Sequence, residues 1–148
     1  QNYVLQNLSY IRQDIYLLDD SIKNNITLYD EDIDEGQLKK VLRLSRLEEY
    51  VNSLPDRIET YVGERGTRIS GGQRQRIGIA RALYKDPRII IFDEATNALD
   101  KENENNIMKD IHNLDIKKNL IIITHRHDLV KNCNKVFTFE DGRLIQQN

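Results

Sequence analysis

Two carboxylates and a histidine occupy the positions in this chain that most directly predict chemistry. Asp93 and Glu94 follow an apolar run of strand length at residues 88–92, and His125 follows a second such run at residues 120–124. Continuous apolar runs are typical of strands buried on both faces of a parallel sheet, and such sheets bind ligands at the carboxyl ends of their strands. The segment from Glu94 to His125 is long enough for one helical crossover, so we expect the two side chains to lie close together.

Adjacent carboxylates at the end of a buried strand need a partner, because burying unpaired charge is unfavourable. A metal ion with a bound phosphate is one such partner for Asp93 and Glu94, and the N-terminus of a following helix is another. His125 is equally open to more than one interpretation. A lone histidine is more often a capping or surface residue than a catalytic one, and His125 with His127 could also form a metal pair.

A second candidate site lies at Ser70-Gly71-Gly72. Ser70 is a good helix N-cap, the glycines allow close approach of the backbone, and the residues from Gln73 onward favour a helix. The first turn of such a helix carries unpaired backbone N–H groups and the positive end of the helix dipole, which together favour an anion such as a phosphate. Taken alone, Ser-Gly-Gly also fits a simple capped helix after a flexible loop.

The full string of residues 69–83, ISGGQRQRIGIARAL, resembles the signature motif of ATP-binding cassette (ABC) ATPases. Residues 89–96 resemble the Walker B motif of the same family. The resemblance implies that Asp93 works on Mg²⁺ and that Glu94 is the general base for the hydrolytic water. It also implies that His125 is the switch histidine, which contacts the γ-phosphate of ATP.

Other stretches extend the resemblance. Gln13 matches the Q-loop glutamine, which reaches the magnesium and the attacking water, although Arg12 stands where proline is common. Residues 98–100 resemble the D-loop at the dimer interface, with Asn97 where serine is common. Glu64 matches the acidic residue of the X-loop of exporter-type domains. The resemblance therefore implies nucleotide contacts from Ser70, Gly71, Gly72, Gln73 and Asp100, and Mg²⁺ ligands from Asp93 and Gln13.

The elements that would position these residues follow from hydrophobic periodicity and from breakers. Strands are expected at residues 8–11, 88–92, 120–124, 135–139 and 143–145. Helices are expected within residues 17–26, at 32–51 before Pro55, from Ser70 to before Pro87, and at 101–114. The third of these helices should bury Ile77, Ala80 and Tyr84, and the last should bury Ile107 and Ile111. The final two strands, joined by a turn at Asp141-Gly142, should close the edge of the sheet.

The resemblance implies a partial α/β fold of the P-loop NTPase-like ABC ATPase type, with a largely parallel central sheet flanked by helices. Residues 1–148 would form the C-terminal part of a single nucleotide-binding domain. About residues 27–84 would be a helical subdomain that bears the signature, and residues 85–148 would belong to the catalytic core.

Composition excludes several other classes of protein. The chain has 148 residues, a formal net charge of -2 and 31% charged residues, so it lacks the basic excess of a nucleic-acid-binding protein. The one cysteine, Cys133, cannot form an internal disulfide, which fits a reducing, cytoplasmic setting. The longest apolar runs are too short to cross a bilayer.

One expected motif is absent from the sequence. No glycine in the chain is followed by lysine, so the phosphate-binding pattern G-x-x-x-x-G-K-[ST] does not occur. In the ABC family this loop lies upstream of the Q-loop, so the resemblance implies that the chain is a C-terminal portion of an exporter ATPase that uses ATP and Mg²⁺. We expect this portion to be inactive alone. Its expected partners are a second nucleotide-binding domain, arranged head to tail, and a transmembrane domain at the cytoplasmic face of a membrane. The alternatives are a soluble ABC ATPase and a truncated docking module without catalysis.

Overall fold

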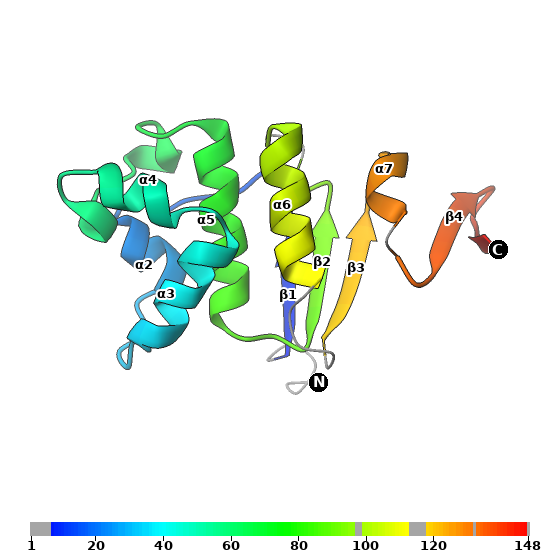
Figure 1. The fold of residues 1–148 in the computed structure, drawn as a ribbon, viewed down its shortest axis with the longest axis horizontal. Coiled ribbons are helices and arrows are strands. Elements are labelled where there is room, and N and C mark those ends of the chain that lie inside the picture. The colour runs from blue at the N-terminus through cyan, green and yellow to red at the C-terminus, as the bar shows by residue number, and fades with distance from the viewer. Residues whose placement is uncertain (1–6, 97–98, 113–117, 132, 148) are drawn as a thin grey trace.

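The computed structural model describes residues 7–96, 99–112, 118–131 and 133–147. Its centre is a parallel sheet of order β1-β2-β3, in which Tyr10 pairs with Ile91 and Ile91 pairs with Ile121. The strands are β1 (Leu8–Ile11), β2 (Ile89–Asp93) and β3 (Asn119–Ile123). Figure 1 shows most of the helices gathered beyond β1 and a hairpin at the opposite end. The expected α/β fold with a parallel sheet and flanking helices is confirmed.

A helical unit occupies the chain between β1 and β2. Its elements are α2 (Ile22–Thr27), α3 (Glu35–Leu44), α4 (Glu48–Ser53), η1 (Arg57–Glu59), η2 (Glu64–Gly66) and α5 (Gly71–Tyr84). The helix predicted over residues 32–51 is two helices. The Ser45 hydroxyl donates back to the Val41 carbonyl at 2.8 Å, and Arg46 adopts a left-handed φ of 57°. This break turns Leu47 into the core, where it is fully buried.

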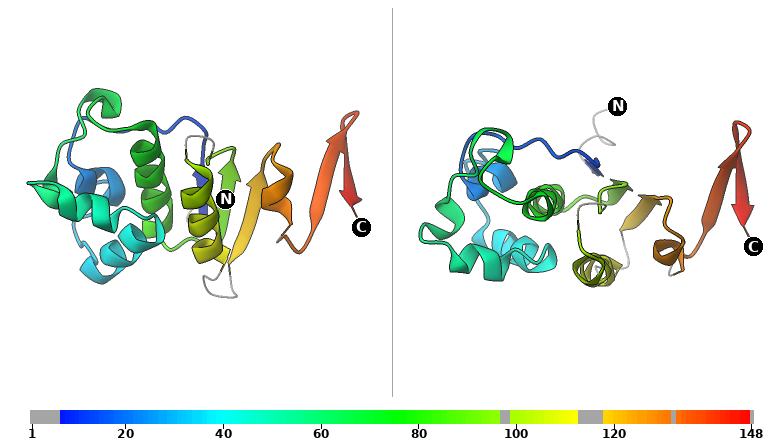
Figure 2. Two further views of the ribbon diagram at one scale, coloured as in Figure 1. Left: turned by 45° about the horizontal axis from the view of Figure 1, so that its top comes forward. Right: turned by 90° about the horizontal axis from the view of Figure 1, so that it is seen from above.

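The two longest helices bury the faces that the sequence predicts. In α5, Ile77, Ala80 and Tyr84 are buried, and in α6 (Lys101–His112) Ile107 and Ile111 are buried. These apolar side chains belong to one continuous core. In Figure 2, α5 and α6 lie to one side of the three strands. Both helices therefore support the same face of the sheet.

The other face of the sheet differs from the prediction. Apolar runs predicted strands buried on both faces, yet burial alternates along β2, where Ile90 and Phe92 are buried and Ile91 only partly so. In β3, Ile121 and Ile123 are 47% and 50% exposed. The physical reason is that α5 and α6 pack on one face, and no described element covers the other.

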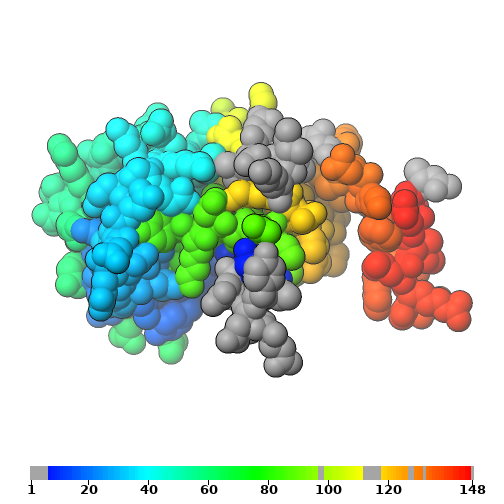
Figure 3. Space-filling view, turned by 90° about the horizontal axis from the view of Figure 1, so that it is seen from below, coloured from blue at the N-terminus to red at the C-terminus, as the bar shows by residue number. Residues whose placement is uncertain are grey.

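The last described part of the chain comprises α7 (His127–Val130), β4 (Val136–Glu140) and β5 (Arg143–Gln147). Within the described residues, the two strands pair only with each other and do not close the edge of the parallel sheet, so that prediction is wrong. Asp141 and Gly142 both have positive φ, and such a turn lets a hairpin satisfy its own backbone hydrogen bonds. In the space-filling view of Figure 3 the hairpin projects from the body, and Phe139 is 72% exposed.

Candidate active site

The carboxyl ends of β2 and β3 bring the predicted catalytic pair together. Glu94 follows β2 directly, and its backbone N–H donates to the Ile123 carbonyl at 3.0 Å, which extends the pairing of the two strands by one residue. His125 comes two residues after β3, and its Nε2 lies 2.5 Å from Oε1 of Glu94. The expected proximity of the two side chains is therefore confirmed. The Glu94 side chain is 23% exposed, while His125 is 90% exposed and open to a ligand.

The backbone at Glu94 is strained. Its φ is 48°, a left-handed value that residues with a side chain adopt rarely. Such conformations cost about 1–3 kcal/mol and concentrate at functional sites, where the surrounding structure holds them. Here the hydrogen bond to Ile123 and the contact with His125 hold Glu94 from two directions.

Asp93 has a partner that sequence reasoning missed. The Tyr10 hydroxyl donates a hydrogen bond to Oδ2 of Asp93, and this bond, more than burial, raises the pKa of Tyr10. Tyr10 pairs with Ile91, and alternation places Asp93, two residues later, on the same face of the sheet. A parallel register between residues 8–11 and 88–92 would have been needed to find this contact from the sequence.

The two predicted Mg²⁺ ligands stand at one edge of the sheet. Asp93 ends β2, and the exposed Gln13 lies two residues beyond the end of the neighbouring parallel strand β1. Mg²⁺ prefers oxygen ligands and is bound in proteins by one or two side chains together with water and substrate phosphates. A carboxylate and an amide oxygen at this edge fit that donor set. Within the described ranges, no group of three or more histidine, cysteine or acidic side chains gathers to form a metal site made by protein alone.

The predicted phosphate-facing helix starts where the sequence places it. Ser70 is the N-cap of α5, its hydroxyl accepts from the Gln73 amide at 3.2 Å, and the Gln73 side chain accepts from the Ser70 amide at 2.8 Å. This reciprocal capping box fixes the first turn and leaves Gly71 and Gly72 as small residues at its tip. The amides of this turn and the helix dipole suit an anion. The Gln73 side chain, predicted to contact the nucleotide, is engaged in the cap.

Asp100 also accepts hydrogen bonds from a neighbouring residue of its own chain. Its carboxylate accepts from the Asn103 side chain at 2.6 Å and from the Asn103 amide at 3.0 Å at the start of α6. These bonds lower the pKa of Asp100, the side-chain bond being the largest cause. Of the other D-loop positions, Asn97 and Ala98 lie outside the described residues, and Leu99 is buried. Glu64, the predicted X-loop acid, is exposed at the start of η2.

An ion pair with one fully buried partner lies next to His125 in the chain. Glu104 on α6 is fully buried, and Arg126, the residue after His125, pairs with it through Nη1. Sequence reasoning missed this pair, although a signal was present. Glu104 lies three and seven residues before Ile107 and Ile111, on the same inward stripe of the helix. An acidic residue on such a stripe requires a partner.

The structure thus presents two candidate sites, Glu94 with His125 at the carboxyl edge of the parallel sheet and the capped tip of α5. A family model described as ABC transporter matches residues 2–97. The chain therefore belongs to the ABC transporter family. No helix among the described residues has the length and apolar character to span a membrane.

Curated relatives resemble the chain along nearly all its length. It is 40% identical over 146 residues to the Toxin RTX-I translocation ATP-binding protein of Actinobacillus pleuropneumoniae, and 38% identical over 139 residues to the ATP-dependent lipid A-core flippase of Paraburkholderia xenovorans. These matches cover 99% and 94% of the chain, but only 21% and 23% of the relatives. A solved bacterial Atm1-family ABC exporter with ATP bound superposes with a TM-score of 0.88 at 32% identity, covering 94% of this chain and 24% of that one.

Proposed function

We propose that this chain is part of the ATP-hydrolysing domain of an exporter-type ABC transporter, which powers movement of a substrate across a membrane. The observation that carries the proposal is the 2.5 Å contact between Glu94 Oε1 and His125 Nε2 at the carboxyl edge of a parallel sheet. The capped tip of α5 supports it. So do the names of the relatives, which include a toxin translocation ATP-binding protein and a lipid A-core flippase.

In the proposed reaction, water attacks the γ-phosphorus of ATP and Glu94 accepts the proton that the water loses. The bond from the γ-phosphorus to the bridging oxygen breaks, and ADP leaves with its electron pair. His125, exposed and held beside Glu94, would donate a hydrogen bond to the γ-phosphate. Asp93 and Gln13 would hold Mg²⁺, which neutralises charge on the phosphates when it is bound.

Two partners follow from this proposal. The tip of α5, with Ser70, Gly71, Gly72 and Gln73, would contact ATP held by a second nucleotide-binding domain arranged head to tail, and Asp100 would lie at the same interface. A transmembrane domain, in the same or a partner chain, would hold the protein at the cytoplasmic face of a plasma or inner membrane. No nucleic-acid partner is proposed, in keeping with the net charge of -2.

The phosphate cradle is proposed to come from a further part of a longer protein. The chain spans 21 to 24% of the length of the relatives it matches, and its sequence contains no G-x-x-x-x-G-K-[ST] pattern. Without the lysine and backbone amides of such a loop, little would hold the β- and γ-phosphates. We therefore propose that the 148 residues alone do not hydrolyse Mg-ATP.

The test is ATP hydrolysis by the longer protein with Glu94→Gln. Losing the general base should reduce turnover by about 100-fold or more, because the amide cannot accept the proton. Glu102→Gln, at an exposed position on α6, is the matched control and should leave turnover unchanged. Turnover within a few-fold of the wild-type rate in Glu94→Gln would overturn the assignment of the base.

A further inference from the structure

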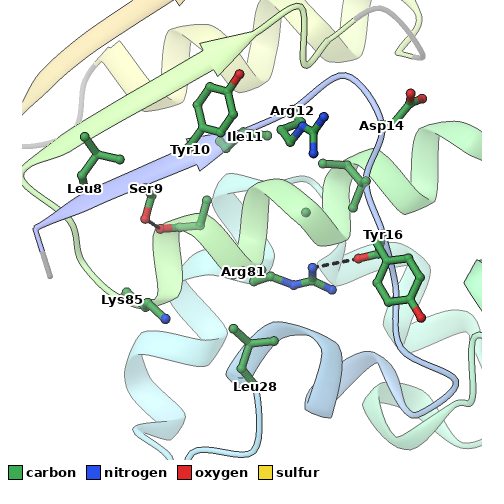
Figure 4. A pocket seen from close by; sticks show the side chains of 13 residues that line it. Leu8, Ser9, Tyr10, Ile11, Arg12, Asp14, Tyr16, Leu28, Arg81 and Lys85 are labelled. Carbon is green, nitrogen blue, oxygen red and sulfur yellow. Dashed lines mark hydrogen bonds between the residues drawn. The ribbon is translucent and has the colours of Figure 1, made fainter. Parts of the chain in front are cut away.

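The segment between β1 and α2, residues 12–20, crosses the second half of α5 and carries Gln13. We call this segment the strap. In Figure 4 the strap passes along α5 on one side of a groove, with Tyr16 facing Arg81. The strap contains no helix or strand, so its path depends on its contacts with α5.

Gly78 allows the strap to lie directly on the helix. A Cβ atom built on Gly78 would lie 2.7 Å, 2.8 Å and 2.9 Å from Cδ1, Cγ1 and Cγ2 of Ile15. All three distances are shorter than real carbon contacts, so any larger residue would force the Ile15 side chain of the strap to move. Glycine is unfavourable inside a helix, and this close approach supplies a reason for its presence in the middle of α5.

Arg81, one turn further along the same helix, binds the strap by hydrogen bonds. Its guanidinium donates to the Tyr16 carbonyl at 2.9 Å, to the Asn25 carbonyl at 2.7 Å and to Oδ1 of Asn25 at 3.0 Å. The acceptors are two backbone carbonyls and one amide oxygen. Burial lowers the pKa of Arg81, and the three charge-assisted bonds offset that loss of hydration.

Asn25 extends the contact to the far end of the strap. It is fully buried, its Oδ1 accepts from the Leu18 amide at 2.8 Å, and its Nδ2 donates to the Leu18 carbonyl at 3.0 Å. The same Oδ1 atom therefore serves both Leu18 and Arg81. Before the strap, the Ser9 hydroxyl of β1 donates to the Ala82 carbonyl of α5 at 2.8 Å. One helix face thus holds the chain on both sides of Gln13.

We propose that Gly78 and Arg81 are positioning residues that fix the strap, and with it Gln13, to the helix whose first turn carries Ser70, Gly71 and Gly72. The inference rests on the proposed function, in which Gln13 belongs to one nucleotide site of the dimer and the tip of α5 belongs to the other. The strap would connect these two sites. A shift of α5 at the dimer interface would then be passed on to the strap. Neither residue touches the reacting atoms.

The first test is hydrogen exchange of the Leu18 amide in the 148-residue chain, and it needs no nucleotide. Arg81→Lys keeps the charge but loses the planar guanidinium group that donates to Tyr16 and Asn25. Asn25 accepts from the Leu18 amide, so this amide should exchange roughly tenfold faster than in the wild type. Amides in the interior of α5 should keep their rates, which separates local release from unfolding. Arg43→Lys, at an exposed position on α3, is the matched control. An unchanged Leu18 amide in folded Arg81→Lys would overturn the proposal.

Gly78→Ala supplies an independent test, because a second substitution should reverse its effect. It should also release the strap, whereas Gly36→Ala in α3, where the added Cβ meets only the Asp34 side chain at 3.2 Å, should not. Combining Gly78→Ala with Ile15→Ala removes the atoms that clash and should restore slow exchange of the Leu18 amide. Effects of Gly78→Ala that persist unchanged in the double variant would contradict direct packing of Ile15 on Gly78.

Kinetics of the longer protein distinguish positioning from mere stabilisation. Arg81→Lys should lower kcat roughly tenfold or more with little change in KM for ATP, because Gln13 is misplaced while the nucleotide still binds. A rise in KM at constant kcat would contradict a positioning role. If the longer wild-type protein did not hydrolyse ATP while Leu18 exchange responded as expected, the proposed function would fail and the structural connection would stand.

Discussion

At the scale of single residues, the ion pair between Glu104 and Arg126 joins α6 to the residue after His125. Glu104 is fully buried and Arg126 is 30% exposed, so Glu104→Ala removes both the ion pair and a side chain that fills the core. We expect Glu104→Ala to lower the free energy of unfolding by about 2 kcal/mol or more, measured by urea denaturation. Glu102→Ala on the exposed side of the same helix should change it by less than about 0.5 kcal/mol. Equal losses in the two variants would rule out a special role for the pair.

Asp20 should make stability depend on pH. Its carboxylate accepts from the Tyr29 hydroxyl at 2.5 Å and from the Ser21 amide at 2.6 Å, and these bonds, Tyr29 first, lower its pKa. A carboxylate with a lowered folded-state pKa stabilises the fold above its unfolded pKa of about 4, and this contribution disappears as the pH falls through the folded value. Asp20→Asn should therefore lower the thermal midpoint at pH 7 and have progressively less effect as the pH falls below about 4. Exposed Asp19→Asn is the control, and a deficit that is the same at every pH would count against this account.

Single residues differ in how far the sequence alone could place them. Glu94 and His125 could be brought together in advance because each follows a strand, and parallel strands end at one edge. Glu104 could have been recognised from its place on the inward stripe of α6. Arg81 could not, because its three acceptors depend on the path of the strap over α5, and no local pattern encodes that path.

At the scale of elements, the start of α5 should depend on its capping box. Ser70→Ala removes the acceptor for the Gln73 amide, so we expect a loss of about 1 kcal/mol in the free energy of unfolding. Ser53 near the end of α4, whose exposed hydroxyl donates to the Tyr50 carbonyl, provides the control, and Ser53→Ala should cost less than about 0.5 kcal/mol. A stability for Ser70→Ala equal to that of the wild type would show that the tip is held by other contacts.

Elements with their own local signals were predicted well. Ser70 before two glycines indicated the start of α5, and apolar runs indicated β2 and β3. Asp141-Gly142 indicated the hairpin turn. The break at Arg46 was missed because the apolar spacing continues through it, and only the core position of Leu47 reveals the turn. The hairpin was placed at the sheet edge wrongly, because its turn specifies its internal register and says nothing about a third strand.

At the scale of the whole molecule, a hydrophobic pattern predicts that a strand is buried but does not show which element covers it. The apolar runs of β2 and β3 predicted cover on both faces, and α5 and α6 supply it on one. The open face carries Tyr10, Ile121 and Ile123, each close to half exposed. Which partner a face requires depends on residues distant in sequence, and for that reason periodicity alone could not decide it.

Nucleotide affinity also depends on the whole molecule. In these 148 residues the predicted phosphate contacts are the tip of α5 and the exposed His125, and a helix dipole at an exposed site contributes about 0.3–1 kcal/mol. Micromolar affinity requires about 8 kcal/mol, so we expect no saturable micromolar binding when the chain alone is titrated with Mg-ATP by calorimetry. The longer protein with a phosphate loop should bind, and the same protein with the loop lysine replaced by alanine is the control. Equal affinity of the short chain would mean that the phosphate cradle lies within these residues, and the roles assigned to Ser70, Gly71 and Gly72 would then have to be rebuilt around it.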